Sequence, residues 1–252
     1  MKKLLITFSG ARYDGTTRQL VEDGPKMGAD KVLVYDDVWL RTTEFYAHND
    51  WLWKHHGGKR GFGWYCWKPF IIQDAMERCE PGDVVLFVDA DTRPVSNFSI
   101  IYDIANRDGA MFFTAHTHSN HRWCKRDCLI VMAQDQDKYK FTQAGVARFM
   151  AFKKGPWKPK QFLMEWLTYC VNPLATTFDK SVLGPEHPEF QEHRTEQAIM
   201  TLLCHKYGYK LHRECDDSGE PYPEDRDIYP QLFEQTRQGD GSNPDGSRFR
   251  NV

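Results

Sequence analysis

The stretch Asp83–Asp91 reads DVVLFVDAD and decides the fold class. Residues 83–88 form a nearly continuous apolar run, which is typical of a central parallel strand that is covered on both faces. The run ends at Asp89 and Asp91, one residue apart. Because open α/β sheets bind ligands at the carboxyl ends of their strands, we expect the chemistry of the protein at this acidic pair.

Further strands and helices are expected on both sides of this strand. The fold class we predict is α/β, a mostly parallel sheet with helices on both faces in a single domain over residues 1–238. Residues 239–252 are polar and predict a flexible tail. The apolar patterns predict strands at 3–9, 31–35, 110–114, 144–152 and 209–212, and helices within 38–54, from Pro69, and near 95–106, 160–171 and 198–207.

Composition narrows the class of protein. With 252 residues, 40% hydrophobic and 27% charged, the chain fits one large domain with a sizeable core. The net charge of -2 argues against a protein whose main binding partner is nucleic acid. Seven cysteines in irregular spacing suit a reducing compartment. Residues 1–6 resemble a signal peptide but are followed too soon by charged residues, and no apolar run approaches the roughly 20 residues of a membrane span. We therefore expect a cytoplasmic protein.

The acidic pair fits two enzyme classes. Carboxylates at a strand end suit Mg²⁺ or Mn²⁺, hard cations that share oxygen ligands with phosphates. The same residues also resemble the first motif of haloacid-dehalogenase-type phosphohydrolases, in which Asp89 would be a nucleophile and Asp91 a general acid. That class needs a later apolar strand that ends in paired acids. Asp216 and Asp217 are the candidates, but the residues before them are too polar for a buried strand, which ranks the hydrolase second.

Five segments together resemble a family of GT-A glycosyltransferases known mainly from bacteria and viruses, related in outline to glycogenin and bacterial galactosyltransferases. The resemblance covers most of residues 3–237. Many of those relatives carry Asp-Ala-Gly at the acidic motif, so Asp91 brings this chain closer to GT-A enzymes in general. The segments are RGFGWYCWKP at 60–69, GDVVLFVDAD at 82–91, WCKRD at 123–127, EWL at 165–167 and HRTEQ at 193–197.

The resemblance implies a nucleotide-sugar donor that lies across the carboxyl ends of the strands. Thr7 and Gly10 would then line the nucleotide, with Gly10 allowing close approach of the backbone. Asp36, or its neighbour Asp37, would bond the base or the ribose. Lys68 would place its ammonium group on the diphosphate. Asp89 and Asp91 would hold the divalent ion.

Three further residues are implied at the sugar. Gln143 precedes a segment of small residues that lets the sugar ring approach the backbone. Glu196 and Gln197 match the Asp-Gln position that lies by the anomeric carbon in glycogenin-like enzymes, with Glu in place of Asp. An inverting reaction would use Glu196 or Asp127 as a general base, whereas a retaining reaction would use the region of Gln197. The resemblance leans to retention.

The resulting expectation is transfer of a hexose from a nucleoside-diphosphate sugar, with UDP as the nucleotide, to a hydroxyl acceptor. The acceptor is left open among a glycan, a lipid-linked saccharide, a protein and a modified nucleic-acid base. A non-catalytic carbohydrate-binding relative is the non-enzymatic alternative. The intact acidic pair argues against it, because a binding protein does not need to neutralise a leaving diphosphate.

Two other groups of residues have competing interpretations. Trp64 and Trp67 can be core residues or can stack on a sugar or base. A cluster of histidines and cysteines can bind zinc, but its spacing matches no familiar zinc pattern, which favours an active-site loop instead. The cluster consists of His116, His118, His121, Cys124 and Cys128.

Overall fold

The computed structural model describes residues 1–10, 13–54, 61–217 and 230–236. The predicted tail at 239–252 lies outside these residues, so its flexibility stays a prediction. Within the described part of the chain, no helix is both long enough and apolar enough to cross a lipid bilayer.

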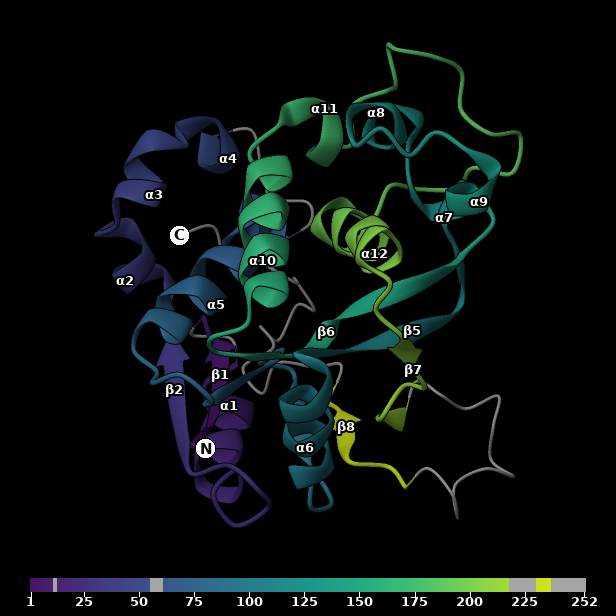
Figure 1. The fold of residues 1–252 in the computed structure, drawn as a ribbon. Coiled ribbons are helices and arrows are strands. Elements are labelled where there is room, and N and C mark those ends of the chain that lie inside the picture. The colour runs from purple at the N-terminus through teal and green to yellow at the C-terminus, as the bar shows by residue number, and fades with distance from the viewer. Residues whose placement is uncertain (11–12, 55–60, 218–229, 237–252) are drawn as a thin grey trace.

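A six-stranded sheet forms the centre of the molecule, in the order β2-β1-β3-β6-β5-β7 (Figure 1). β1 pairs in parallel with both β2 and β3, and β5 pairs in parallel with β7, whereas β6 runs antiparallel between β3 and β5. The predicted mostly parallel sheet is thereby confirmed. The strands are β1 (Lys3–Phe8), β2 (Lys31–Tyr35), β3 (Val84–Val88), β5 (Ala110–Ser119), β6 (Gln143–Lys153) and β7 (Leu211–His212).

Helices cover both faces of the sheet, as predicted (Figure 1). The two faces build two apolar clusters, because successive side chains of a strand point to opposite sides. Val85 and Phe87 of β3 pack in one cluster, and Val84, Leu86 and Val88 pack in the other. The first face carries α5 (Trp67–Glu77), α10 (Trp157–Cys170) and α12 (Thr195–Tyr207), and the second carries α1 (Asp14–Asp23) and α6 (Ser99–Asp108).

Short elements fill the connections between these layers. The helical region predicted at 38–54 is broken into three helices, and the side chains of Asp36 and Thr43 cap the first two. The short helices are α2 (Asp37–Arg41), α3 (Glu44–His48), α4 (Asp50–Lys54), η2 (Phe62–Tyr65), α7 (Asn120–Trp123), α8 (Arg126–Val131), α9 (Asp137–Lys140) and α11 (Pro173–Thr176).

Three features differ from the sequence-based expectations. α5 begins at Trp67, two residues before Pro69, which is compatible because proline is tolerated in a first helical turn. β5 continues to Ser119 through residues that we expected in a polar loop. A second, two-stranded sheet joins β4 (Thr92–Pro94) to β8 (Phe233–Gln235) in antiparallel fashion. This small sheet brings the region after residue 230 back to the acidic motif.

Candidate active site

A pocket lies where the end of β3 meets the first turns of α5 and α12. Asp89 follows the last residue of β3, Lys68 lies in the first turn of α5, and Glu196 lies in the first turn of α12. The lining residues are Tyr65, Lys68, Asp89, Val146, Ala147, Arg148, Phe178, His193, Arg194, Thr195, Glu196 and Gln197. The structure thus brings together Lys68, Asp89, Glu196 and Gln197, four of the predicted site residues.

A buried ion cluster forms the floor of this pocket. Lys68 Nζ lies 3.0 Å from Asp89 Oδ1 and 3.3 Å from Glu196 Oε1. The same ammonium group donates a hydrogen bond of 2.8 Å to the backbone carbonyl of Ala147. Only 4% of the Lys68 side chain is exposed. Its ammonium group therefore interacts with the two carboxylates, which it holds in place, rather than with solvent.

The charges of the cluster are not balanced. Burial raises the pKa of both Asp89 and Glu196, and the nearby Lys68 offsets part of that rise. Burial alone would lower the pKa of the Lys68 ammonium, but the two carboxylates outweigh burial and raise it. One cation therefore faces two anions, and the cluster has a net negative charge when all three groups are ionised.

Asp91 lies next to this cluster without lining the pocket itself. Its negative charge raises the pKa of Asp89 further and also raises the pKa of the Arg148 guanidinium. The backbone carbonyl of Asp91 accepts hydrogen bonds of 2.8 and 2.9 Å from the amide and the hydroxyl of Thr236, just beyond β8. The small second sheet therefore fixes the backbone of the acidic motif.

The donor set of Asp89 and Asp91 fits a hard divalent cation. Both are carboxylates at one strand end, one residue apart, so their like charges repel each other; this repulsion adds to burial in raising the pKa of Asp89. A cation between them would relieve that repulsion, and oxygen ligands are those that Mg²⁺ and Mn²⁺ prefer.

Arg148 and Arg194 supply positive charge at the pocket. Arg148 Nη1 forms an ion pair of 2.7 Å with Asp216, whose side chain is fully buried, and 22% of the Arg148 side chain remains exposed. Burial and the Arg194 charge lower the pKa of neighbouring His118 to about 4. Neither arginine was predicted. Arg148 interrupts the apolar run of β6 and could have been singled out for that reason, and Arg194 stands in the HRTEQ motif beside the predicted Glu196.

The first turn of α12 is held firmly around Glu196. Glu196 Oε2 accepts a 2.6 Å hydrogen bond from the Thr195 hydroxyl, and its backbone carbonyl accepts one of 2.9 Å from the Trp166 indole. Thr195 has a φ of 45°, an unfavourable value for a β-branched residue. Gln197 Oε1 accepts a 3.3 Å hydrogen bond from the amide of Ala147. This motif therefore links α12 to β6 at the pocket.

The aromatic loop before α5 contributes a tyrosine rather than a tryptophan to the pocket. Trp64 and Trp67 are 6% and 5% exposed and pack in the core, with Trp67 stacked 4.0 Å from Phe8 between ring centroids. The alternative of stacking on a ligand is not supported for these two residues. Tyr65 lines the pocket instead, and Lys68 Nζ lies 5.1 Å from its ring centroid. Trp64 and Tyr65 both have positive φ values, so the backbone there is strained.

Two predicted site residues lie outside the pocket and have other partners. Asp127 is completely buried, and its carboxylate accepts hydrogen bonds of 2.8 to 3.0 Å from the amides of Val182 and Leu183. The side-chain amide of Gln143 donates to the backbone carbonyls of residues 115, 116 and 118. Both side chains thus organise neighbouring backbone, and neither lines the site where we expected it.

The predicted nucleotide-binding residues lie at the carboxyl ends of β1 and β2. Thr7 is fully buried, and its hydroxyl finds no hydrogen-bond partner in the described part of the chain. A Cβ atom at Gly10 would meet no described atom within 4 Å, which leaves room for a ligand there. The exposed Asp36 uses Oδ1 to accept a 2.7 Å hydrogen bond from the amide of Trp39 as the cap of α2. Their contact with a nucleotide stays a prediction.

The predicted histidine and cysteine cluster does not converge. Cys124 and Cys128 are buried in the apolar core, and Cys128 contacts Met132 at 3.8 Å between sulfurs. Burial raises the pKa of the Cys124 thiol well above its ordinary value, which disfavours the thiolate that zinc requires. Of the five residues, His121 alone belongs to a described group that could hold a metal ion, and its companions there are His187 and Glu189.

Comparison with known proteins returns distant structures. No protein-family profile matches the sequence, and no curated protein matches it. The chain is similar to mouse xyloside xylosyltransferase 1, with 11% identity, coverage of 93% of this chain and 97% of that chain, and a TM-score of 0.43. It is also similar to a glycosyltransferase involved in the glycosylation of the major capsid of PBCV-1, with 15% identity, coverage of 93% and 94%, and a TM-score of 0.44.

A third structure, the WbbM bifunctional glycosyltransferase, is 10% identical with a TM-score of 0.45, and 85% of this chain aligns with 38% of that chain. All three are glycosyltransferases, the class that the sequence motifs resemble. Similarity at this level does not assign an activity.

Proposed function

We propose that the protein transfers a glycosyl group, a hexose, from a nucleoside-diphosphate sugar to a hydroxyl acceptor, with UDP as the nucleotide. The observation that carries the proposal is the buried cluster of Lys68, Asp89 and Glu196, in which one ammonium group holds a strand-end carboxylate and a helix-start carboxylate in the same pocket. The Asp89 side leads to Asp91, just outside the pocket, and suits a diphosphate with its cation. The Glu196 side leads to Gln197 and suits the sugar.

The charges of the pocket support this division. Asp89 and Asp91 would hold Mg²⁺ or Mn²⁺, and a bound metal would supply neutralisation of the charge that develops on the leaving diphosphate. Arg148 lines the pocket, and its positive charge acts on Asp89, so its guanidinium group can contact phosphate oxygens there. Arg194 also lines the pocket, but its guanidinium group lies over the Trp123 ring, 4.4 Å from the ring centroid. Lys68 has a role different from the predicted one, because it holds carboxylates rather than offering a free ammonium group to phosphate.

The size of the pocket suits one part of the donor. Its volume of about 200 Å³ is below the roughly 300–1,000 Å³ of pockets that enclose whole ligands. We therefore place the sugar ring in this pocket and the nucleotide along the ends of β1 and β2, near Thr7, Gly10 and Asp36.

The hydrogen bonds of the two candidate bases favour retention of stereochemistry. A general base must accept a proton from the acceptor hydroxyl. Glu196 uses Oε1 for Lys68 and Oε2 for Thr195, while Asp127 lies outside the pocket and binds backbone amides. We accordingly propose a retaining reaction, with Gln197 and the backbone beside Ala147 closest to the anomeric carbon.

The phosphohydrolase alternative lacks its second acidic motif. It required Asp216 and Asp217 at the end of a buried strand, but β7 consists of Leu211–His212 at the edge of the sheet. Asp216 is paired with Arg148, and Asp217 accepts a 2.8 Å hydrogen bond from the amide of Gln235. No described feature favours this alternative over glycosyl transfer.

A panel of nucleotide sugars tests the proposal. UDP and a UDP-hexose should raise the melting temperature with Mn²⁺ present and lose most of that effect in EDTA, because a ligand at a hundredfold excess over its Kd stabilises the native state by about 2.7 kcal/mol. One donor of the panel should also be turned over slowly to free sugar. Stabilisation by carbohydrate alone, without any donor turnover, would support the non-catalytic binding protein. Release of phosphate from simple phosphomonoesters, with an aspartyl-phosphate mimic trapped on Asp89, would support the hydrolase.

A further inference from the structure

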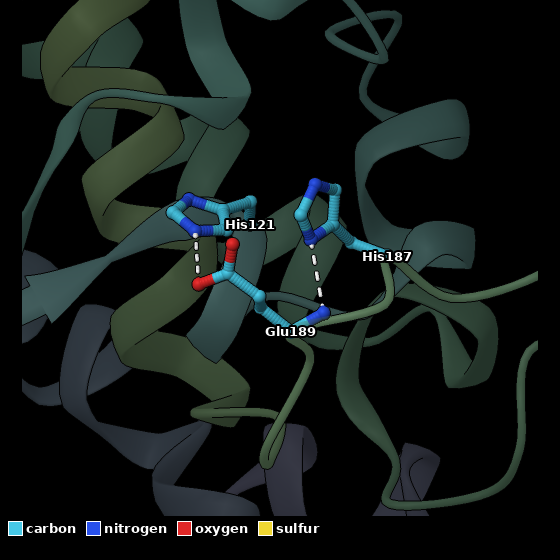
Figure 2. Close-up of side chains that lie close together, drawn as sticks. All are labelled: His121, His187 and Glu189. Carbon is cyan, nitrogen blue, oxygen red and sulfur yellow. Dashed lines mark hydrogen bonds and ion pairs between the residues drawn. The ribbon is translucent and has the colours of Figure 1, made fainter.

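A second group of ligand-type side chains lies apart from the pocket. His121 belongs to α7, and His187 and Glu189 lie on the segment between α11 and α12. One potential ligand atom from each lies within 4.8 Å of the other two, and His121 Nε2 is 3.6 Å from Glu189 Oε2. Figure 2 shows the Glu189 carboxylate turned toward the His121 ring, and the His187 ring beside them with one nitrogen facing the backbone amide of Glu189.

The hydrogen bonds around His121 orient its ring for coordination. Its Nδ1 pairs with the Ser119 hydroxyl at 3.2 Å, at the end of β5, while Nε2 faces Glu189. Metal-binding histidines commonly use one ring nitrogen for the metal and the other for such a partner. His187 Nδ1 accepts a 3.1 Å hydrogen bond from the amide of Glu189, so this nitrogen carries a lone pair rather than a proton. A metal at this atom would replace that amide.

The two histidine rings pack against an aromatic side chain, whereas the glutamate is open to solvent. The His121 and His187 ring centroids are 4.7 Å apart, and Phe141 packs at 4.9 Å from the first and 5.7 Å from the second. The His121 side chain is only 12% exposed, whereas that of Glu189 is 64% exposed. The two rings are therefore held in place, and an ion can enter from the Glu189 side.

We propose that His121, His187 and Glu189 bind a divalent transition-metal ion of the zinc type, with water in the fourth position. Two imidazoles favour zinc, cobalt or nickel over Mg²⁺, which takes oxygen ligands. Metal–ligand distances near 2.1 Å in a tetrahedron place neighbouring ligand atoms roughly 3.4 Å apart. The 3.6 Å between His121 and Glu189 is close to that value, and the exposed Glu189 side chain can make the remaining adjustment.

The ion would fasten the segment that leads into the pocket. The amide of Gln191 donates to the carbonyl of Arg122 at 2.9 Å, and the amide of Arg194 donates to the carbonyl of Trp123 at 3.0 Å. Both carbonyls lie on α7, beside His121. A metal that joins His121 to His187 and Glu189 thus tightens the same junction, shortly before the pocket residues of this segment, which begin at His193. This inference does not depend on the proposed activity.

Calorimetric titration with ZnCl₂ tests the site. The parent protein for this titration is the full chain carrying Asp91→Asn, so that zinc bound at the acidic pair contributes less to the measured heat. This parent should bind one Zn²⁺ tightly at His121, His187 and Glu189. His187→Ala and Glu189→Gln should each weaken that binding at least roughly 10-fold, since loss even of a residue that only orients a ligand costs 10- to 100-fold. His48→Ala removes an exposed histidine of α3 and should leave the affinity unchanged.

Two outcomes would overturn the proposal: no tight Zn²⁺ binding to the parent, or the same affinity in the parent and in both cluster variants. Melting curves without metal check that each variant is folded, and Glu189→Gln is the safer variant because that side chain is mostly exposed. Hydrogen exchange adds a local readout. Zn²⁺ should slow exchange of the Gln191 and Arg194 amides in the parent and not in His187→Ala, and equal exchange with and without Zn²⁺ in the parent would refute the fastening role.

Discussion

Replacing Lys68 with Met tests whether the buried ammonium group holds the site together. Methionine keeps most of the volume but leaves Asp89 and Glu196 facing each other without their shared cation. Both side chains of the Lys68–Glu196 pair are 4% exposed, so water cannot screen the loss. Removing one partner of a buried ion pair costs about 3–5 kcal/mol, which corresponds to a drop of roughly 6–20 °C in melting temperature for a chain of this size.

The stability of Lys68→Met should also depend on pH more steeply than that of the wild type. Without the cation, the pKa values of Asp89 and Glu196 in the folded state rise further above those of the unfolded chain. The native state then binds more protons, and the free energy of unfolding increases as the pH falls from 8 toward the unfolded-state pKa values. Urea unfolding at pH 8 and pH 6 measures this difference directly.

A double-mutant cycle separates charge from packing. Adding Glu196→Gln to Lys68→Met removes one of the two carboxylate charges that Lys68→Met leaves without a cation. The two substitutions should therefore show a coupling free energy of roughly 0.5–3 kcal/mol. A loss of less than about 0.5 kcal/mol in Lys68→Met at pH 8, the range of ordinary surface substitutions, would contradict the role assigned to the buried ammonium group. The same loss of stability at both pH values would contradict it as well.

Two further predictions concern carboxylates with different roles. Asp91→Asn should weaken Mn²⁺-dependent UDP binding together with turnover, whereas Glu196→Gln should lower turnover while the affinities for UDP and Mn²⁺ change little. Titration calorimetry gives the affinities of both variants, and donor-turnover rates give their activities. Wild-type turnover in Glu196→Gln would show that this residue does not act on the sugar side of the site. Burial, and then the charge of Asp216, raises the pKa of Glu214 to about 7, so this residue contributes stability below its folded pKa that is lost as the pH rises through 7. Glu214→Gln should flatten that loss in urea unfolding between pH 6 and 8, and an unchanged slope would contradict the assignment.

The central strand and its acidic pair could be predicted because their signals are local. An apolar run as continuous as 84–88 needs cover on both faces, and the carboxyl edge of a sheet is where ligands bind. Glu196 and Gln197 follow from the resemblance of the HRTEQ segment to GT-A enzymes, and the structure places both in the pocket with Asp89. For the central strand and its acidic pair, the residue types and their immediate neighbours contained the information.

The burial of Lys68 could not be predicted in the same way. A lysine before Pro69 has the pattern of a surface residue, and its partner Glu196 lies 128 positions later in the chain, in the first turn of α12. Gln143 is a similar case, because its side-chain amide donates hydrogen bonds to backbone carbonyls of β5. The polar sequence of this strand gave no sign that it extends to Ser119. Such roles are set by long-range packing rather than by local pattern.

Asp127 provides the sharpest contrast between the two kinds of inference, because its sequence context predicts a catalytic base and its contacts indicate a structural role. Asparagine offers one acceptor oxygen where the carboxylate uses two for the amides of Val182 and Leu183. Hydrogen bonds to a charged group are worth about 1.5–3 kcal/mol, so Asp127→Asn should lower the melting temperature by roughly 3–12 °C.

At a temperature where Asp127→Asn remains folded, its kcat and the pH profile of kcat should match those of the wild type, since the carboxylate lies outside the pocket. Thermal melting and donor-turnover rates measured across pH on the same preparation give both quantities. A missing general base would instead lower kcat and remove one limb of its pH profile while leaving stability nearly intact. That outcome would return Asp127 to the reaction and reopen the inverting mechanism, because Glu196, the other candidate base, is already bound to Lys68 and Thr195.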